Sequence, residues 1–137
     1  MILTEKLHRL AADFSVLPDA QERLSAVVHQ TRRHALLPAA ERTDAHRVAG
    51  CVSVVWVVGE LRDGRCHFRG DAESPLVRGL VTFVCEFFSD APAAEIAASD
   101  TDPLETLGLA RDLSPTRRNG LAAVRQTILA FARRAAA

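Results

Sequence analysis

Cys51, Cys66 and Cys85 are the three thiols of this chain, and a thiol is the side chain most readily used as a nucleophile. Cys51 stands at the start of an apolar, β-branched run, directly after Gly50 and a polar stretch, so its thiol can lie at an edge near solvent. Such a position suits the nucleophilic thiolate form. The same position fits a buried, structural cysteine at least as well, because cysteine is among the most buried residue types and packs as a small hydrophobe.

The other two cysteines give weaker functional signals. Cys66 lies in a short β-like run and Cys85 lies in an apolar helical pattern, and packing explains both. The odd number of cysteines argues against a disulfide framework. The chain contains no CxxC, no HExxH and no cluster of Cys and His at ligand spacing, so the sequence predicts no metal site and no bound cofactor.

One histidine is placed to influence Cys51. The five histidines are scattered, and none has a spacing to a carboxylate that suggests a metal pair. His46 precedes Cys51 by a short loop and would tune the pKa of the thiol if that loop folds back. No acid–base dyad or phosphate-binding loop is present, which disfavours a stand-alone enzyme.

Composition limits the class of protein. A chain of 137 residues with 48% hydrophobic residues fits one compact domain over residues 1–137. The 17 basic and 17 acidic residues give zero formal net charge, which disfavours binding to nucleic acid or to an anionic membrane. The first residues resemble neither a signal nor a transit peptide, and no apolar run approaches the roughly 20 residues that span a bilayer. We therefore expect a cytoplasmic protein.

Apolar periodicity and capping residues predict the helices that frame the cysteines. The predicted helices cover residues 4–17, 19–34, 75–88, 91–98, 102–107 and 115–134, with Asp19, Ser74, Asp90, Asp102 and Ser114 as N-caps. The helix that starts at Pro75 has an apolar face that predicts extensive burial. We expect the Ala-rich C-terminal tail to fray.

A β-hairpin is predicted between the second and third helices. Residues 51–58 and 66–69 are β-branched or apolar runs, and Asp63-Gly64 is a hairpin turn signal. A turn centred near residue 62 would pair Val58 with Cys66 and Cys51 with Glu73. Cys51 and Cys66 would then lie roughly 20 Å apart along the sheet. The predicted fold class is α+β, a small antiparallel sheet built on this hairpin with helices packed on one face.

Four blocks of the sequence resemble the SufE family of sulfur-acceptor proteins. Residues 50–56, GCVSVVW, are similar to the family's GCQSQVW and follow Arg47-Val48 as in that family. Residues 70–80, GDAESPLVRGL, resemble (A/G)DSDAxIVKGL, residues 113–121, LSPTRRNGL, resemble LSPSRSNGL, and residues 13–14 with 36–38 match the helical lead-in. The resemblance covers about residues 5–134. Val52 and Val54 replace both glutamines of the first block.

The resemblance implies a specific role for Cys51. In this family the cysteine of the GC motif takes the outer sulfur of a persulfide on a SufS-type cysteine desulfurase and passes it to a scaffold such as SufBCD. The implied fold is an α+β sandwich shared with IscU-type scaffolds. Asp71, Glu73 and Arg117 fall in the matched blocks, and we expect all three to support docking of the partner. Glu73 and Arg117 are also candidates for gating the Cys51 loop. The motif reads Asp71-Ala72-Glu73 where the family has Asp-Ser-Asp.

Two other functions remain open at this point. The chain could activate a desulfurase allosterically with Cys51 dispensable, or it could be an iron–sulfur scaffold. A cluster needs several convergent thiolates, and the predicted distance between Cys51 and Cys66 disfavours that function. The sequence leaves open whether the protein is a monomer or a homodimer.

Overall fold

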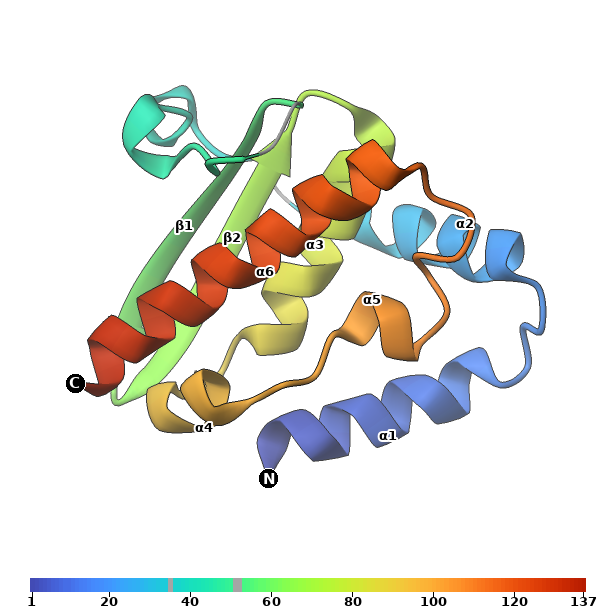
Figure 1. The fold of residues 1–137 in the computed structure, drawn as a ribbon, viewed down its shortest axis with the longest axis horizontal. Helices are drawn as coiled ribbons and strands as arrows, with labels where there is room; N and C mark the ends of the chain where they lie inside the picture. The colour runs from blue at the N-terminus through green and yellow to red at the C-terminus, as the bar shows by residue number, and fades with distance from the viewer. Residues whose placement is uncertain (35, 51–52) are drawn as a thin grey trace.

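The computed structural model describes residues 1–34, 36–50 and 53–137. An antiparallel sheet in the order β1-β2-β3 lies among helices, so the predicted α+β class is confirmed (Figure 1). The elements are α1 (Ile2–Phe14), α2 (Ala20–Thr31), the 3₁₀ turns η1 (Ala39–Glu41) and η2 (Asp44–His46), β1 (Val55–Arg62), β2 (Arg65–Ala72), α3 (Pro75–Phe88), β3 (Ala91–Pro92), α4 (Ala93–Ala98), α5 (Pro103–Thr106) and α6 (Pro115–Ala136).

The hairpin of β1 and β2 turns at Asp63-Gly64. Both residues have positive φ, 53° and 77°, the combination that a two-residue type I′ turn requires. The turn pairs Leu61 with Cys66 and Val58 with Arg69. The predicted pairing of Val58 with Cys66 is therefore wrong by three positions, because the turn residues are 63 and 64 and its centre is not near residue 62.

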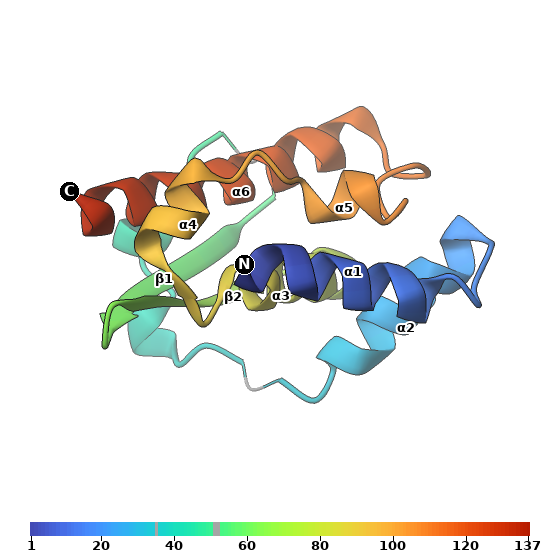
Figure 2. The same cartoon turned by 90° about the horizontal axis from the view of Figure 1, so that it is seen from below.

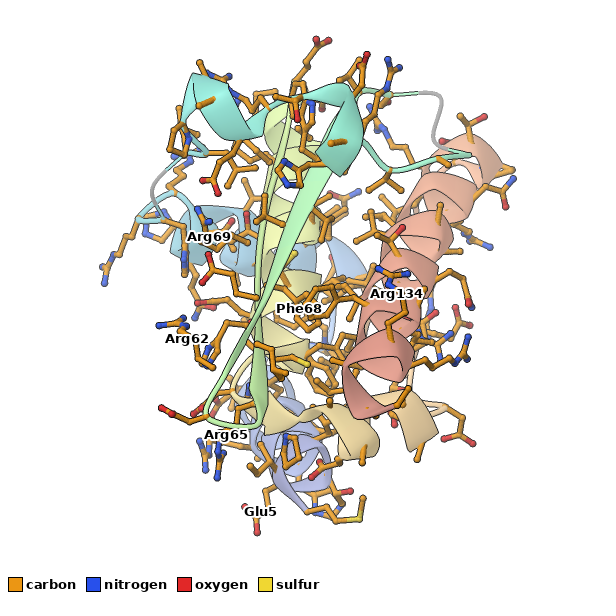
Figure 3. All side chains as sticks on the ribbon, turned by 90° about the vertical axis from the view of Figure 1, so that its left-hand side faces the viewer. Glu5, Arg62, Arg65, Phe68, Arg69 and Arg134 are labelled. Carbon is orange, nitrogen blue, oxygen red and sulfur yellow. The ribbon has the colours of Figure 1, made fainter. Side chains whose placement is uncertain are left out.

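The two faces of the sheet differ in chemistry. Phe68 points toward α6, whereas Arg69 points to the opposite side (Figure 3). Helices α3 and α6 cover the first face, and two glycines let them approach closely. A Cβ on Gly59 would lie 2.8 Å from the ring of Phe131, and a Cβ on Gly70 would lie 2.5 Å from Val81. The second face, the outer face, carries the segment of η1 and η2 that leads to Cys51 (Figure 2).

A short third strand replaces part of a predicted helix. β3 pairs with β2 through Ala91 opposite Cys66. The expectation of a helix from residue 91 capped by Asp90 is wrong, because Asp90 adopts a positive φ of 61° and its N–H donates to the Cys66 carbonyl at 2.8 Å. Helix α4 begins only after Pro92, which cannot donate a hydrogen bond within the helix.

The other predicted caps are confirmed. Asp19, Ser74, Asp102 and Ser114 each accept a backbone N–H in the first turn of their helices. Helix α3 is largely buried, as its apolar face predicts. Helices α1 and α2 end about three residues earlier than predicted, at Phe14 and Thr31. Helix α6 continues to Ala136, two residues beyond its predicted end, and the expected fraying of the tail stays a prediction.

Helices α1 and α2 pack on α3. Lys6 of α1 donates from Nζ to the carbonyls of Glu86, Phe87 and Ser89 at 2.6–3.1 Å, so it caps the C-terminal end of α3. Burial lowers the pKa of Lys6. In the described part of the chain, no helix is long and apolar enough to cross a membrane.

Candidate functional site

The chain is described on both sides of Cys51, although Cys51 and Val52 themselves lie outside the described residues. The N–H of Val48 donates to the carbonyl of Val55 at 2.9 Å, which closes a loop over residues 49–54. The N–H of Glu73 donates to the carbonyl of Val54 at 3.3 Å and extends the β1–β2 pairing. Val48 and Val55, the paired residues on either side of Cys51, therefore lie at the end of the hairpin opposite the Asp63-Gly64 turn.

Both described ends of this loop lie beside the N-terminal half of α6. Gly50 has φ 82°, and a Cβ built on it would lie 3.9 Å from Cβ of Ala123. Ser53 lines a crevice with Thr116, Arg117 and Gly120. The crevice has a volume of about 10 Å³, which is room for at most one water molecule.

The start of α6 gives this region a positive electrostatic character. The exposed Arg117 lies in the first turn, and its N–H donates to the Ser114 hydroxyl at 3.2 Å. The N-terminus of a helix carries a partial positive charge, and a guanidinium adds a full one. An anion such as a thiolate is stabilised by both.

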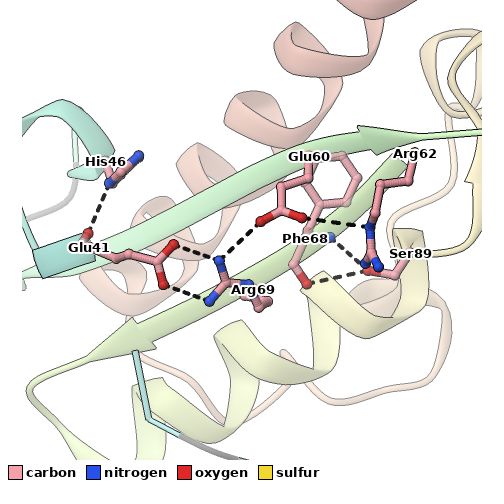
Figure 4. Close-up of polar contacts among 7 residues, drawn as sticks. All are labelled: Glu41, His46, Glu60, Arg62, Phe68, Arg69 and Ser89. Carbon is pink, nitrogen blue, oxygen red and sulfur yellow. Dashed lines mark hydrogen bonds and ion pairs between the residues drawn. The ribbon is translucent and has the colours of Figure 1, made fainter. Parts of the chain in front are cut away.

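An ion-pair cluster fixes the segment that precedes the loop. Arg69 of β2 donates from Nη1 and Nη2 to the two carboxylate oxygens of Glu41 at 2.7 and 2.6 Å, and Nη2 also contacts Glu60 at 3.3 Å (Figure 4). Hydrogen bonding to Arg69 lowers the pKa of Glu41, and the same bonds raise the pKa of Arg69. This two-point contact attaches η1 to the outer face of the sheet.

Further contacts hold the same segment. The guanidinium of Arg42 lies 6.0 Å from the ring centre of Trp56 on β1, and Arg47 forms an isolated bridge to Trp56. His46 places Nδ1 2.9 Å from the carbonyl oxygen of Glu41 (Figure 4). The predicted influence of His46 on the Cys51 thiol stays a prediction.

Asp71 joins three parts of the fold. Its side chain is 2% exposed and accepts hydrogen bonds from the N–H of Leu37 at 3.1 Å, from its neighbour Ala72 at 2.8 Å and from Nε of Arg78 at 2.8 Å. The carboxylate thus connects the Leu37-Pro38 segment, β2 and α3. These bonds account for Asp71 structurally, and its expected support of docking stays a prediction.

Glu73 and Arg117 are both exposed. The observed register brings Glu73 opposite Val54, so the predicted pairing of Glu73 with Cys51 is wrong for the same reason as the pairing of Val58 with Cys66. Arg117 lines the crevice at Ser53 and also a larger hollow between α2 and α6. Their expected roles in docking or gating remain predictions.

The two other thiols lie in the hydrophobic core. Cys66 and Cys85 are 0% and 1% exposed. Burial raises the pKa of Cys66, and burial followed by the charge of Glu86 raises the pKa of Cys85 to about 12. Thiols in such surroundings are protonated and inert at neutral pH. Within the described ranges, no group of three or more His, Cys, Asp or Glu side chains could hold a metal ion.

Comparison with known protein families matches residues 8–132 to the family described as "SufE: Fe-S metabolism associated domain". The chain belongs to the SufE family. This membership places it in iron–sulfur metabolism. Uncharacterised SufE-like proteins of Rhizobium etli and Rhizobium meliloti are 36% and 34% identical over 120 residues, which cover 84% of this chain and 81% and 86% of those proteins.

Two further similarities extend the comparison. A solution structure of a hypothetical protein from Thermus thermophilus has a TM-score of 0.75 to this SufE-family chain at 18% identity, covering 98% of this chain and 96% of that one, which shows a shared fold. The chloroplastic quinolinate synthase of Arabidopsis thaliana is 30% identical over 105 residues, which cover 76% of this chain but only 15% of that enzyme. A SufE-like segment is therefore a small part of that longer protein.

Sequence reasoning missed the cluster that attaches the loop. Glu41 and Arg69 are far apart in the sequence, and neither is in a block that resembles the family motifs. The alternation of side chains along a strand would have placed Arg65, His67 and Arg69 on one face, opposite the apolar Cys66 and Phe68. That pattern gives an arginine on the outer face but does not identify its partner.

Proposed function

We propose that this SufE-family protein is a sulfur carrier in which Cys51 accepts sulfur from a SufS-type cysteine desulfurase. The Cys51 thiolate attacks the outer sulfur of the partner's cysteine persulfide. A new S–S bond forms on Cys51, the partner's S–S bond breaks, and the electron pair leaves on the partner's thiolate. The step is an exchange that needs no external oxidant or reductant. Transfer onward to a SufBCD-type scaffold would repeat it with Cys51 as the donor.

The observation that carries this proposal is the contrast between the loop and the core. The loop of residues 49–54 is closed by the Val48–Val55 hydrogen bond and flanked by the positive start of α6. Cys66 and Cys85 are buried and have raised pKa values. Burial thus disfavours Cys66 and Cys85 as sulfur acceptors, and the match of residues 50–56 to the family's GC block supports Cys51. A carrier of this kind needs no cofactor of its own.

Intact-mass measurement tests the proposal. The protein is incubated with a cysteine desulfurase, pyridoxal phosphate and free cysteine, and wild type is compared with Cys51→Ser. We expect wild type to gain the mass of one sulfur atom, reversibly with a thiol reductant, and Cys51→Ser to gain none. Peptide mapping of wild type should place the sulfur on the peptide that contains Cys51 and leave the Cys66 and Cys85 peptides unmodified.

The same variant separates the carrier from an allosteric activator. An activator would keep stimulating the desulfurase after Cys51→Ser, whereas a carrier loses the stimulation that depends on sulfur removal. Sulfur found on Cys66 or Cys85, or none on folded wild type with an active desulfurase, would contradict the proposal.

A further inference from the structure

A groove of about 520 Å³ lies between α2 and the start of α6, beside the site. Leu24 and Val28 of α2, with Leu76 of α3 and the buried Leu113, give it an apolar floor. We call it the α2–α6 groove. Its size suits a few side chains of a partner protein.

The rim of the α2–α6 groove is mainly basic. His29 and Arg32 at the end of α2 and Arg117 of α6 line it, with Asp112 as the single carboxylate among the described lining residues. Arg32 and Arg117 are both exposed. In the part of the chain that the structure describes, neither guanidinium forms an ion pair or donates a side-chain hydrogen bond. By contrast, Arg65, Arg69 and Arg78 each contact a carboxylate.

The groove is continuous with the surface around the Cys51 loop. Arg117 lines both the groove and the crevice at Ser53. At the other end, Val28 and Arg32 also line a hollow of about 210 Å³ next to Leu36, an apolar side chain that is 55% exposed. A partner segment in the groove would therefore pass from the sulfur-transfer site across α2.

We infer that the α2–α6 groove docks an acidic segment of the cysteine desulfurase, with apolar side chains on the floor and carboxylates at Arg32 and Arg117. This inference rests on the proposed function. Charge complementarity selects an acidic occupant, since two unpaired guanidiniums face a single carboxylate. The desulfurase is the partner that fits, because its persulfide must reach the loop that adjoins the groove at Arg117.

Charge reversal at one end of the groove tests the inference. Arg32→Glu is compared with Arg133→Glu. Both arginines are exposed and lie at the C-terminal end of a helix, so a new carboxylate meets the same unfavourable helix dipole in both variants. We expect Arg32→Glu to raise the Kd for the desulfurase about tenfold at low salt, and Arg133→Glu to change it less than about twofold. The difference should shrink in high salt, since salt screens exposed charges.

The two proposals fail in different ways. At saturating desulfurase, Arg32→Glu should still accept one sulfur on Cys51, because the variant changes docking and leaves the thiol intact. Equal affinities of Arg32→Glu and wild type, with normal sulfur acceptance, would overturn the groove assignment and keep the carrier. Absence of sulfur on wild type would overturn the carrier itself.

A photo-crosslinking amino acid at Ser25 identifies the occupant directly. Ser25 is exposed on α2 and lines the groove. After irradiation of the complex, peptide mapping should find the crosslink on a desulfurase segment rich in Asp and Glu. The same probe at Arg133 should give no crosslink to that segment. A crosslink from Ser25 to a basic or neutral segment, or to a second copy of this chain, would contradict the inference.

Discussion

Arg69 holds the Glu41 carboxylate through both of its terminal nitrogens, at 2.7 and 2.6 Å, and thereby ties the segment before the Cys51 loop to the middle of β2. Such a two-point contact fixes orientation as well as distance. The contact lies on the surface, where an ion pair adds little to global stability. Its consequence is local, because it limits how far the segment of η1 and η2 can move away from the sheet.

Removal of the contact between Arg69 and Glu41 should make the segment of η1 and η2 more mobile without unfolding the protein. We predict that Arg69→Met increases amide hydrogen exchange in residues 39–50, while Tm stays close to that of wild type. Arg62→Met is the control, since Arg62 is exposed and its one ion pair among the described residues is a 3.6 Å contact with Glu60. Equal exchange in wild type and Arg69→Met would show that other contacts fix the segment.

The pH dependence of this contact has a definite sign. The pKa of Glu41 lies below its usual range because Arg69 bonds its ionised form. The stabilisation is therefore fully present above the ordinary Glu pKa and is lost as pH falls through the lowered folded value. We predict constant exchange in residues 39–50 between pH 5 and 8, after correction for intrinsic rates, and loosening only under more acid conditions. In Glu41→Gln, residues 39–50 should exchange fast at every pH. Faster exchange of this segment in wild type near pH 6 would show that another group titrates there.

The thiols should differ sharply in native-state labelling. With a pKa of about 12 for Cys85, about one molecule in 10,000 has the thiolate at pH 8. We predict that an alkylating reagent modifies Cys51 of the folded protein first, and modifies Cys66 and Cys85 only after denaturation. Cys51→Ser is the control and should take up almost no reagent when folded. Rapid native labelling of Cys66 or Cys85 would show that the core opens more readily than its packing indicates.

Local chemistry made most of the fold predictable. The N-cap side chains of Asp19, Ser74 and Ser114 each bond a backbone N–H two or three residues further along the chain. Such local bonds can be predicted from the sequence directly. The hairpin register failed because it depends on which residues occupy the turn, and a shift of the turn moves every cross-strand pair. β3 was not predicted, because a strand of two residues is too short to show the alternating pattern of apolar and polar residues that indicates a strand.

The site was predictable where it depends on a motif and not where it depends on packing. The GC block predicts Cys51 as the acceptor, which stays a prediction, and the structure adds the bond between Val48 and Val55 on either side of it. The contact between Glu41 and Arg69 and the α2–α6 groove arise from residues distant in sequence. No local pattern encodes which helix end lies beside which loop.

Gly70 offers a test of how the sheet and α3 fit together. A Cβ at this position would lie 2.5 Å from Cγ1 of Val81, 3.0 Å from the sulfur of Cys85 and 3.2 Å from the carbonyl of Trp56. Val81 is fully buried and β-branched, so it cannot turn away at low cost. We predict that Gly70→Ala lowers the free energy of unfolding by about 2 kcal/mol in urea titrations.

A double-mutant cycle checks the cause of that loss. Val81→Ala alone should also destabilise, because it leaves a cavity in the core. The combination Gly70→Ala with Val81→Ala should be less destabilised than the sum of the single variants by roughly 1 kcal/mol, since the new methyl group fills the space that Val81 vacates. Strict additivity would show that the cost of the new methyl group comes from its contacts with Cys85 or the Trp56 carbonyl and not from Val81.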